Sequence, residues 1–427
     1  MKKILIILSV LLTFIAVKGF GYEAGDIQIH GYVSQGYLKS DRNNFIAETE
    51  EGSFQFNETC INFSTYLSPG LRAGMQFLAR DFGSVGNDEV EIDWAYGDYQ
   101  WRDELGIRAG KIRIPLGFHT ETRDIDMTRS NILLPAGVYN ESWRDVFSAL
   151  KGVGIYGEID LNKLGSLSYQ GLAGDLGLDN ESGIFKYMDD LIYTTTYDID
   201  TEAVYAANVR WETPVSGLRF EASAMWTKWD AKFTTDDGHY WRNMTVDVIY
   251  KETGIQTDYD TAREYFDLVG MNVKMPVKSF PYMLSAEYTR ENLRVIAEYY
   301  ELTSDYSFIL ESLSMTLEEG TEHQQGYYGG IEYRFTDWLE IGAYYSVFYP
   351  DKYDKNGDYK VSYYKLPNHT AWIKDTCLSV RFDINLNWIL KLEGHMMDGT
   401  AILHRTDNHD GMDKDWFLFA VKVTFSF

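Results

Sequence analysis

The chain has 427 residues, with 39 Lys and Arg against 64 Asp and Glu, which gives a formal net charge of -25. Two cysteines exclude a disulfide scaffold, and a hydrophobic fraction of 45% excludes a disordered acidic chain. An acidic chain repels phosphate, so we expect no nucleic-acid partner, whereas 15% aromatic residues beside 36 Gly and only 8 Pro favour β-structure.

The first residues have the pattern of a secretory signal peptide. Lys2 and Lys3 precede an apolar run at 4–17, and small residues follow at Gly19 and Gly21. The run is too short for a comfortable membrane-spanning helix. We therefore expect a signal peptide at 1–21, cleaved after either glycine, and one domain at 22–427.

Beyond this segment the hydropathy alternates with a period of two residues. No later stretch approaches 18 uncharged apolar residues, which excludes a helical membrane protein. Apolar and polar residues alternate instead, as in strands with one oily and one wet face. The clearest such segments are 71–80, 205–212, 218–226, 293–299, 327–335, 378–384, 388–393 and 417–427.

Aromatic residues indicate which face of these strands meets lipid. Trp211, Trp226, Tyr299, Phe335 and Trp388 lie on the apolar faces near predicted strand ends, where a membrane barrel has its aromatic girdles. The opposite faces carry Arg, Glu and Asp between Gly and Ser. Together with the signal peptide, this pattern favours a transmembrane barrel with a water-filled lumen over a soluble barrel.

The connections give the strand count. Short connections near 68–70, 102–104, 160–164, 214–216, 290–292, 336–338 and 385–386 alternate with long ones at 38–53, 81–89, 114–151, 175–203, 230–281, 303–325, 350–375 and 398–416. A further candidate strand at 266–275 breaks this alternation, so we place it inside a loop. The prediction is an all-β, antiparallel barrel of sixteen strands, with eighteen as the alternative, short periplasmic turns and long extracellular loops.

Three segments carry a family resemblance. They are the opening strand at 27–32 (IQIHGY), the segment 108–117 (RAGKIRIPLG) and the last strand, whose face carries Phe417, Phe419, Val421, Val423, Phe425 and Phe427. In these parts the chain resembles the sixteen-strand porins of Gram-negative outer membranes, with the phosphate-selective group as the nearest relatives.

The resemblance implies passive diffusion of small hydrophilic solutes or ions, a loop folded into the pore and a homotrimer among lipid and lipopolysaccharide of the cell outer membrane. It implies no cofactor and no enzymatic activity. A preference for phosphate does not carry over, because the predicted lumen is not predominantly basic. Two other functions stay open, an outer-membrane hydrolase and a structural or adhesive barrel with a plugged lumen.

The third long connection, 114–151, is the candidate pore-constricting loop. A basic side would consist of Lys111, Arg113, Arg123 and Arg129, and an acidic side of Asp124 and Asp126, with Glu121 nearby. Opposed charges across a narrow pore create a transverse field that favours polar solutes. The alternative is a solvated loop of mixed charge.

Other charged residues give weaker predictions. Opposite charges on the lumen wall are nearly balanced and can pair across strands, which leaves ion selectivity open. A loose calcium-loop pattern surrounds Gly411, although its spacing misses the EF-hand pattern and a solvated loop is the plainer reading. The wall candidates are Arg72, Arg80, Arg108, Arg210, Arg219, Arg294, Arg334 and Arg381, and the calcium candidates are Asp407, Asp410, Asp413 and Asp415.

Overall fold

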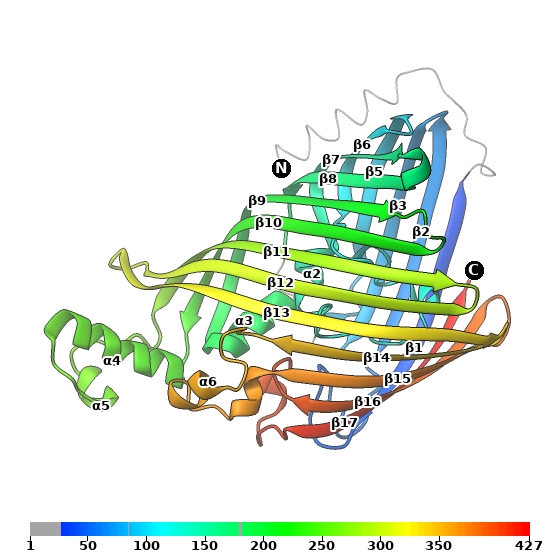
Figure 1. The fold of residues 1–427 in the computed structure, drawn as a ribbon. Helices are drawn as coiled ribbons and strands as arrows, with labels where there is room; N and C mark the ends of the chain where they lie inside the picture. The colour runs from blue at the N-terminus through cyan, green and yellow to red at the C-terminus, as the bar shows by residue number, and fades with distance from the viewer. Residues whose placement is uncertain (1–26, 84, 179–181) are drawn as a thin grey trace.

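The structure is a computed structural model that describes residues 27–83, 85–178 and 182–427. The expected signal peptide at 1–21 lies outside the described residues. Within them, one antiparallel sheet closes on itself, because the first strand pairs with both the second and the last (Figure 1). The three-residue strand β4 (Val85–Asn87) pairs with β3 inside a loop, while β3 pairs directly with β5. The described residues therefore form a barrel of sixteen strands, as predicted.

The barrel strands follow one another around the wall in sequence order. They are β1 (Gln28–Ser40), β2 (Asn57–Ser68), β3 (Leu71–Phe82), β5 (Glu91–Arg102), β6 (Leu105–Arg113), β7 (Ala149–Asp160), β8 (Ser166–Asp175), β9 (Thr194–Glu212), β10 (Leu218–Thr235), β11 (Asn272–Arg290), β12 (Leu293–Leu310), β13 (Met315–Thr336), β14 (Leu339–Tyr349), β15 (Ile373–Asp383), β16 (Trp388–Gly399) and β17 (Asp415–Ser426).

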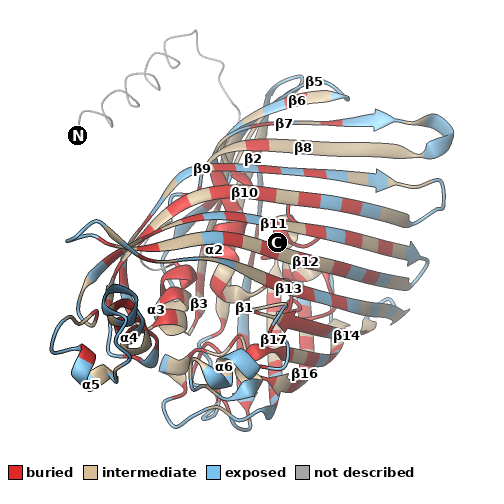
Figure 2. Ribbon diagram, turned by 60° about the vertical axis from the view of Figure 1, so that its left-hand side comes forward, coloured by how far each residue is buried: buried red, intermediate tan, exposed pale blue. Residues whose placement is uncertain are grey.

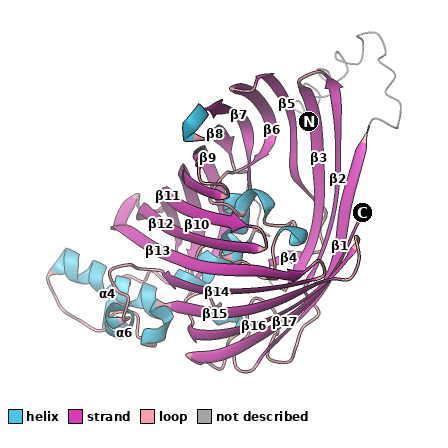
Figure 3. Cartoon of the chain, turned by 45° about the vertical axis from the view of Figure 1, so that its right-hand side comes forward, coloured by secondary structure: helices cyan, strands magenta, loops and turns pink. Residues whose placement is uncertain are grey.

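Short and long connections lie at opposite ends of the barrel, which we name the short-turn side and the long-loop side. Among the described residues, no helix is both long enough and apolar enough to span a bilayer. Helices occur in the connections (Figure 3): η2 (Thr120–Thr122), η3 (Asp126–Thr128), η4 (Glu141–Trp143), α2 (Arg144–Ser148), η5 (Asn162–Leu164), α3 (Gly183–Ile192), α4 (His239–Thr253), α5 (Tyr259–Ala262), α6 (Asp358–Ser362), η6 (Asn368–Ala371) and η7 (Arg405–Asp407).

Several predicted loop boundaries are wrong, since β9 begins at Thr194 within the expected 175–203 connection and β11 begins at Asn272 within the expected 230–281 connection. The expected long connection at 303–325 is mostly strand, because β12 runs to Leu310 and β13 starts at Met315. The candidate strand at 266–275 is not a separate strand, since its last four residues begin β11. In both places the strands continue beyond the short span that a bilayer requires, and apolar residues such as Phe308 and Leu310 are buried there against loop helices.

The two faces of the wall have the predicted polarity on the short-turn half of the barrel. On β10, Phe220 is exposed on the outer face, while Glu221 and Ser223 are buried on the inner face. Exposed and buried residues alternate along strands around the barrel (Figure 2). On β15, for example, Leu378 is exposed while Ser379 and Arg381 are buried. The outer surface therefore presents an apolar face to its surroundings, and the charges point inward.

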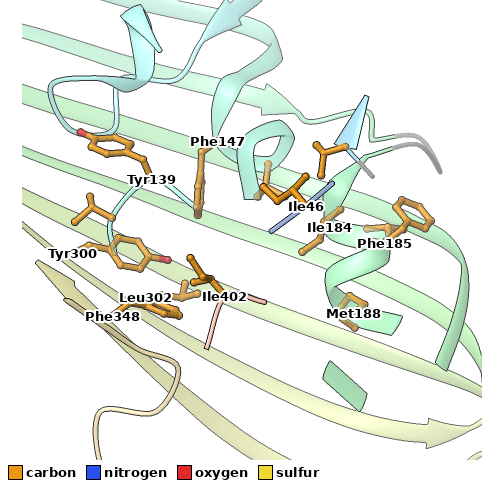
Figure 4. Close-up of a cluster of buried hydrophobic side chains, with 14 of the residues drawn as sticks. Ile46, Tyr139, Phe147, Ile184, Phe185, Met188, Tyr300, Leu302, Phe348 and Ile402 are labelled. Atoms are coloured by element: carbon orange, nitrogen blue, oxygen red, sulfur yellow. The ribbon is translucent and has the colours of Figure 1, made fainter. Parts of the chain in front are cut away.

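On the long-loop half the inner face is mostly apolar, and packed side chains fill much of the lumen there. Met225, Phe233 and Leu302 point inward and are nearly inaccessible. Loop residues pack against this face and complete a hydrophobic core inside the barrel (Figure 4). Each fully buried large side chain stabilises the fold by about 1.5–3 kcal/mol. The labelled members of the core are Ile46, Tyr139, Phe147, Ile184, Phe185, Met188, Tyr300, Leu302, Phe348 and Ile402.

The outer face can be tested by placing one charge in it. Leu284 on β11 is 52% exposed and lies six residues from the short-turn end of its strand, near the middle of a membrane span. We expect Leu284→Arg to lower the free energy of unfolding in lipid vesicles by about 2–4 kcal/mol, because the guanidinium meets hydrocarbon. Leu313→Arg, on the exposed 311–314 connection, is the matched control and should change it by less than about 0.5 kcal/mol. Equal effects in urea titrations would contradict a lipid-facing β11.

Candidate pore constriction

Residues 114–148, which we name the inward segment, connect β6 to β7 and cross the barrel interior. The segment contacts opposite walls. Its Glu141 carboxylate lies 3.3 Å from Arg80 on β3, and its Phe118 backbone N–H donates to Glu298 on β12 at 2.9 Å. Around the wall, β12 is the eighth strand after β3 (β5, β6, β7, β8, β9, β10, β11, β12), which is half of the sixteen-strand circumference. The inward segment therefore spans the lumen instead of following one wall.

Asp126 is the most deeply buried charge of the inward segment. The Lys391 Nζ on β16 donates to the Asp126 Oδ1 at 2.9 Å and to its backbone carbonyl at 2.6 Å. Lys422 on β17 lies 3.4 Å from the same carboxylate, and the Thr424 hydroxyl donates to Oδ2 at 2.8 Å. Burial by itself would raise the pKa of Asp126, but the two ammonium groups hold that pKa far below its usual value.

Asp124 is the centre of a second buried cluster. Arg144 of α2 forms two hydrogen bonds with its carboxylate, at 3.1 and 3.0 Å, and Arg113 donates to the same carboxylate at 3.3 Å. Arg113 also contacts Asp93 on β5. Although burial opposes ionisation, these guanidinium groups lower the pKa of Asp124. The cluster joins the inward segment to β5 and β6.

Wall carboxylates hold the backbone of the inward segment. The Glu393 carboxylate on β16 accepts hydrogen bonds from the Ile132 and Leu133 backbone N–H groups at 2.5 and 2.9 Å. Glu298 accepts from the Tyr139 hydroxyl at 2.6 Å, and Glu332 on β13 accepts from the Ser130 hydroxyl at 2.7 Å. Backbone donors that would otherwise be buried without a partner are satisfied in this way.

The seven predicted constriction residues do not form two opposed charged rows. Arg123 donates to Glu141 at 2.7 Å, and Arg129 donates to the backbone carbonyl of Arg123 at 2.6 Å. Glu121 accepts from Gln170 on β8 at 3.3 Å, and Lys111 donates to the Ile92 carbonyl at 2.6 Å. The remaining three, Arg113, Asp124 and Asp126, belong to the buried clusters described above. In this structure the charges pair locally instead of facing one another across an open eyelet.

Most of the predicted wall arginines are paired with carboxylates of neighbouring strands. Arg294 illustrates the pattern, because it lies 2.7 Å from Glu287 and 3.0 Å from Glu332. Such pairing removes the free positive charge that an anion filter would need. The other contacts are Arg80 with Glu141, Arg108 with Asp98, Arg210 with Glu221, Arg219 with Glu287, Arg334 with Glu340 and Asp383, and Arg381 with Asp383, while Arg72 is in register with Asp98 on β5.

The four calcium candidates lie at one end of the 400–414 connection and the start of β17. The Asp407 carboxylate is occupied by the Lys186 ammonium at 2.7 Å. Lys414 lies 3.6 Å from Asp415. Asp410 and Asp413 complete the set, but among the described residues these four carboxylates do not converge within metal-ligand distance of one another.

The sequence pattern did not single out the lysine pair that binds Asp126. Lys391 and Lys422 are direct cross-strand partners on β16 and β17. Like charges opposite one another on adjacent strands repel, so this pair required a carboxylate between the two ammonium groups. The alternation identified both faces, but only the register places the two lysines together.

Two hollows in the lumen lie on the short-turn side. One hollow of about 380 Å³ is bordered by Ile125 and Met127 of the inward segment and by Tyr32 and Asn62 of the wall. A second, of about 270 Å³, lies between Met127 and the Arg294 region. Two narrower, partly open spaces on the long-loop side of the segment have volumes of about 20 and 10 Å³, which is the size of a single water molecule.

Ser142, His404 and Asp190 lie next to one another in the arrangement serine, histidine, aspartate of a hydrolase triad, but they do not have its geometry. The Ser142 Oγ lies 2.8 Å from the His404 Nε2, but the His404 Nδ1 is 3.9 Å from Asp190, too far for a hydrogen bond. Ser142 and His404 are 2% and 3% exposed, and none of the four hollows described above is lined by Ser142. The contact joins three connections and gives a substrate no access.

Comparison with known proteins identifies the fold. No protein-family model and no curated protein matches the chain. Among solved structures, OmpT of Vibrio cholerae matches with a TM-score of 0.54 at 10% identity, covering 94% of this chain and 97% of that one, and OmpT has also been solved in a trimer form. OmpF of Salmonella typhi in complex with daunomycin matches with 0.53 at 12% identity over 94% and 97%. The outer-membrane channel DcaP of Acinetobacter baumannii matches with 0.52 at 10% identity over 96% and 99%.

Removal of the Asp126 charge tests how firmly the inward segment is attached. Asp126→Asn leaves Lys391, which is wholly buried, without its carboxylate. We expect the free energy of unfolding to fall by about 3–5 kcal/mol, since an uncompensated buried charge remains. Asp410→Asn on an exposed loop is the control and should change it by less than about 0.5 kcal/mol. If urea titrations show that Asp126→Asn lowers the free energy of unfolding by less than about 1 kcal/mol, the ion pair of Asp126 with Lys391 contributes little to holding the inward segment in place.

The loop contact of His404 should depend on pH. Burial, with a smaller effect of Lys186, lowers the pKa of His404 to about 4. Between about pH 6.5 and 4, His404 takes up a proton in the unfolded loop but not in the folded loop. The free energy of unfolding this loop therefore falls as the pH falls, by about 3 kcal/mol across the whole window. We expect hydrogen exchange in 400–414, corrected for its intrinsic pH dependence, to accelerate across this window. His404→Gln should remove the effect, and an equal effect in that variant would contradict the assignment.

Proposed function

The chain has the sixteen-strand, porin-like barrel fold, and on this premise we propose that it is an outer-membrane channel for passive diffusion of small hydrophilic solutes or ions. The observation that carries the proposal is the polarity of the wall. An apolar outer face encloses, on the short-turn half, an inner face of paired charges beside hollows of about 380 and 270 Å³. A solute in those hollows meets hydrogen-bonding groups, whereas lipid meets mainly apolar side chains.

The proposal places the protein in the outer membrane of a Gram-negative bacterium. Short turns would then face the periplasm, and the long connections, with α4 and α6, would face outward toward lipopolysaccharide. A homotrimer is the proposed assembly, supported by the trimer form in which the similar barrel of OmpT has been solved. A cleaved signal peptide at 1–21 would deliver the chain across the inner membrane.

The inward segment would set the size limit for passage. Narrow, partly open spaces of about 10 and 20 Å³ between this segment and the long-loop half admit water but not a sugar. Larger solutes would therefore pass only when the segment moves. We propose weak ion selectivity and no preference for phosphate, because carboxylates neutralise the wall arginines, and the likeness to phosphate-selective porins rests on short sequence segments alone.

A second candidate function is a structural barrel with a plugged lumen. One observation favours it, namely that the inward segment is bound to opposite walls through buried charges. The hydrolase that the sequence left open has no such support, because the Ser142 and His404 side chains are buried and inaccessible to a substrate. Measurement of transport separates the channel from the plugged barrel.

We expect the purified protein to show stepwise ion conductance in planar bilayers and to admit a small sugar into liposomes. The Ser130 and Ser379 hydroxyl oxygens are 3.3 Å apart, so Ser130→Cys with Ser379→Cys can form a disulfide between the inward segment and β15. Oxidation should lower sugar entry at least severalfold, and a reductant should restore it.

Both cysteines should be placed in a chain with Cys60→Ser and Cys377→Ser, and the Ser379→Cys variant alone is the matched control. A wild-type barrel that passes neither ions nor sugar would contradict the channel and favour the plugged barrel. Sugar entry that is unaffected by oxidation would show that solutes pass the segment without moving it.

A further inference from the structure

A group of potential metal ligands lies on the inner face of β15 and β16. Cys377, Glu393 and His395 are each about 1% exposed, and one ligand atom from each lies within 4.8 Å of the others. Cys377 and His395 are direct cross-strand partners, and Glu393 lies two residues from His395 on the same face. The sheet register therefore fixes all three on two adjacent strands, which is a rigid frame for a ligand set.

The surroundings of His395 resemble the outer shell of a metal ligand. Its Nδ1 lies 3.1 Å from both carboxylate oxygens of Asp375, and the Tyr344 hydroxyl donates to Asp375 at 3.0 Å. The other ring nitrogen, Nε2, lies 2.8 Å from the Glu393 Oε1. Metal-binding histidines characteristically donate one ring N–H to a carboxylate, which orients the ring and directs the second nitrogen at the metal.

The charges at this position are unbalanced. Asp375 and Glu393 are 3% and 1% exposed, and both contact the same imidazole. Within the described ranges, no lysine or arginine forms an ion pair with either carboxylate. Even if His395 is protonated, one of the two negative charges has no positive counter-charge. A buried carboxylate without a counter-charge is costly, and a divalent cation would offset that cost.

We propose that Cys377, Glu393 and His395 bind a divalent transition metal, with zinc as the best fit. The thiolate sulfur, one carboxylate oxygen and the Nε2 nitrogen would be the ligands, and Asp375 would orient His395. This mixed sulfur, nitrogen and oxygen set suits zinc and its neighbours and does not suit calcium or magnesium. Bonds of about 2.0–2.3 Å require the Glu393 oxygen and the Nε2 to separate by roughly 0.5 Å, which a side-chain rotation provides.

The metal would sit beside the attachment of the inward segment. The same Glu393 carboxylate accepts the Ile132 and Leu133 backbone N–H groups. A carboxylate oxygen has two lone pairs, so the lone pair that now faces Nε2 can bind the metal while the backbone hydrogen bonds remain. Metal binding thus stiffens the side chain that fixes the segment to β16.

Cobalt(II) provides the test, because a thiolate ligand produces an intense near-ultraviolet charge-transfer band. The full chain is refolded in detergent with one equivalent of cobalt, so that burial in the folded barrel does not limit access. We expect the band at a stoichiometry of one, its displacement by zinc, and no displacement by magnesium. Cys377→Ser should abolish the band, and His395→Gln should abolish binding.

Cys60→Ser is the matched control, since Cys60 is also buried but lies on β2, away from this group. It should leave the band unchanged. Asp375→Asn should weaken zinc binding about 10–100-fold without abolishing it. If the Cys377 or His395 variants fail to fold, X-ray absorption of the zinc-loaded wild-type chain should still show one sulfur among nitrogen and oxygen neighbours. The absence of a thiolate band after refolding, or a band that survives Cys377→Ser, would overturn the proposal.

Discussion

The requirement that every backbone hydrogen bond be made inside the protein governs this structure. In hydrocarbon an unpaired N–H or C=O costs several kcal/mol, so a sheet that crosses a bilayer cannot have a free edge. The chain meets the requirement by pairing β1 with β17, from Tyr32 opposite Ser426 to Ser40 opposite Leu418. Because successive side chains of each strand point to opposite faces, one face of the closed sheet points outward and the other into the lumen. The buried charge clusters lie on the inner side.

Inside that wall, the pairing of buried charges decides what the lumen contains. Asp126 with Lys391 and Lys422, and Asp124 with Arg113 and Arg144, attach the inward segment at different points of the circumference. Such pairs contribute little net stability compared with an apolar core, but an unpaired member is strongly destabilising. They therefore fix one arrangement of the segment more than they strengthen the barrel, and the apolar core of Figure 4 provides the stabilisation.

The result is a barrel with two different halves. The short-turn half has a charged inner face and open hollows, whereas the long-loop half is filled by packed aromatic and aliphatic side chains. The group formed by Cys377, Glu393 and His395 lies where the two halves meet, beside the backbone attachment at Glu393. Solutes and the attachment of the inward segment would thus share one region of the wall. For this reason we propose two candidate functions, the channel and the plugged barrel.

The sequence alone determined which residues of the barrel strands face outward and which face inward. A period of two residues is a local property, so the polarity of strands such as 205–212 and 417–427 could be predicted without coordinates. The alternation of short and long connections could be predicted as well, except at the short 311–314 connection between β12 and β13. The contents of the lumen depend instead on contacts between residues far apart in the chain, such as Asp126 with Lys391 and Phe118 with Glu298, and no local pattern encodes them. The sequence predicted opposed rows of loop charges near the pore, but only the tertiary structure decided which of these charges pair, because pairing depends on where a closed barrel brings distant strands together.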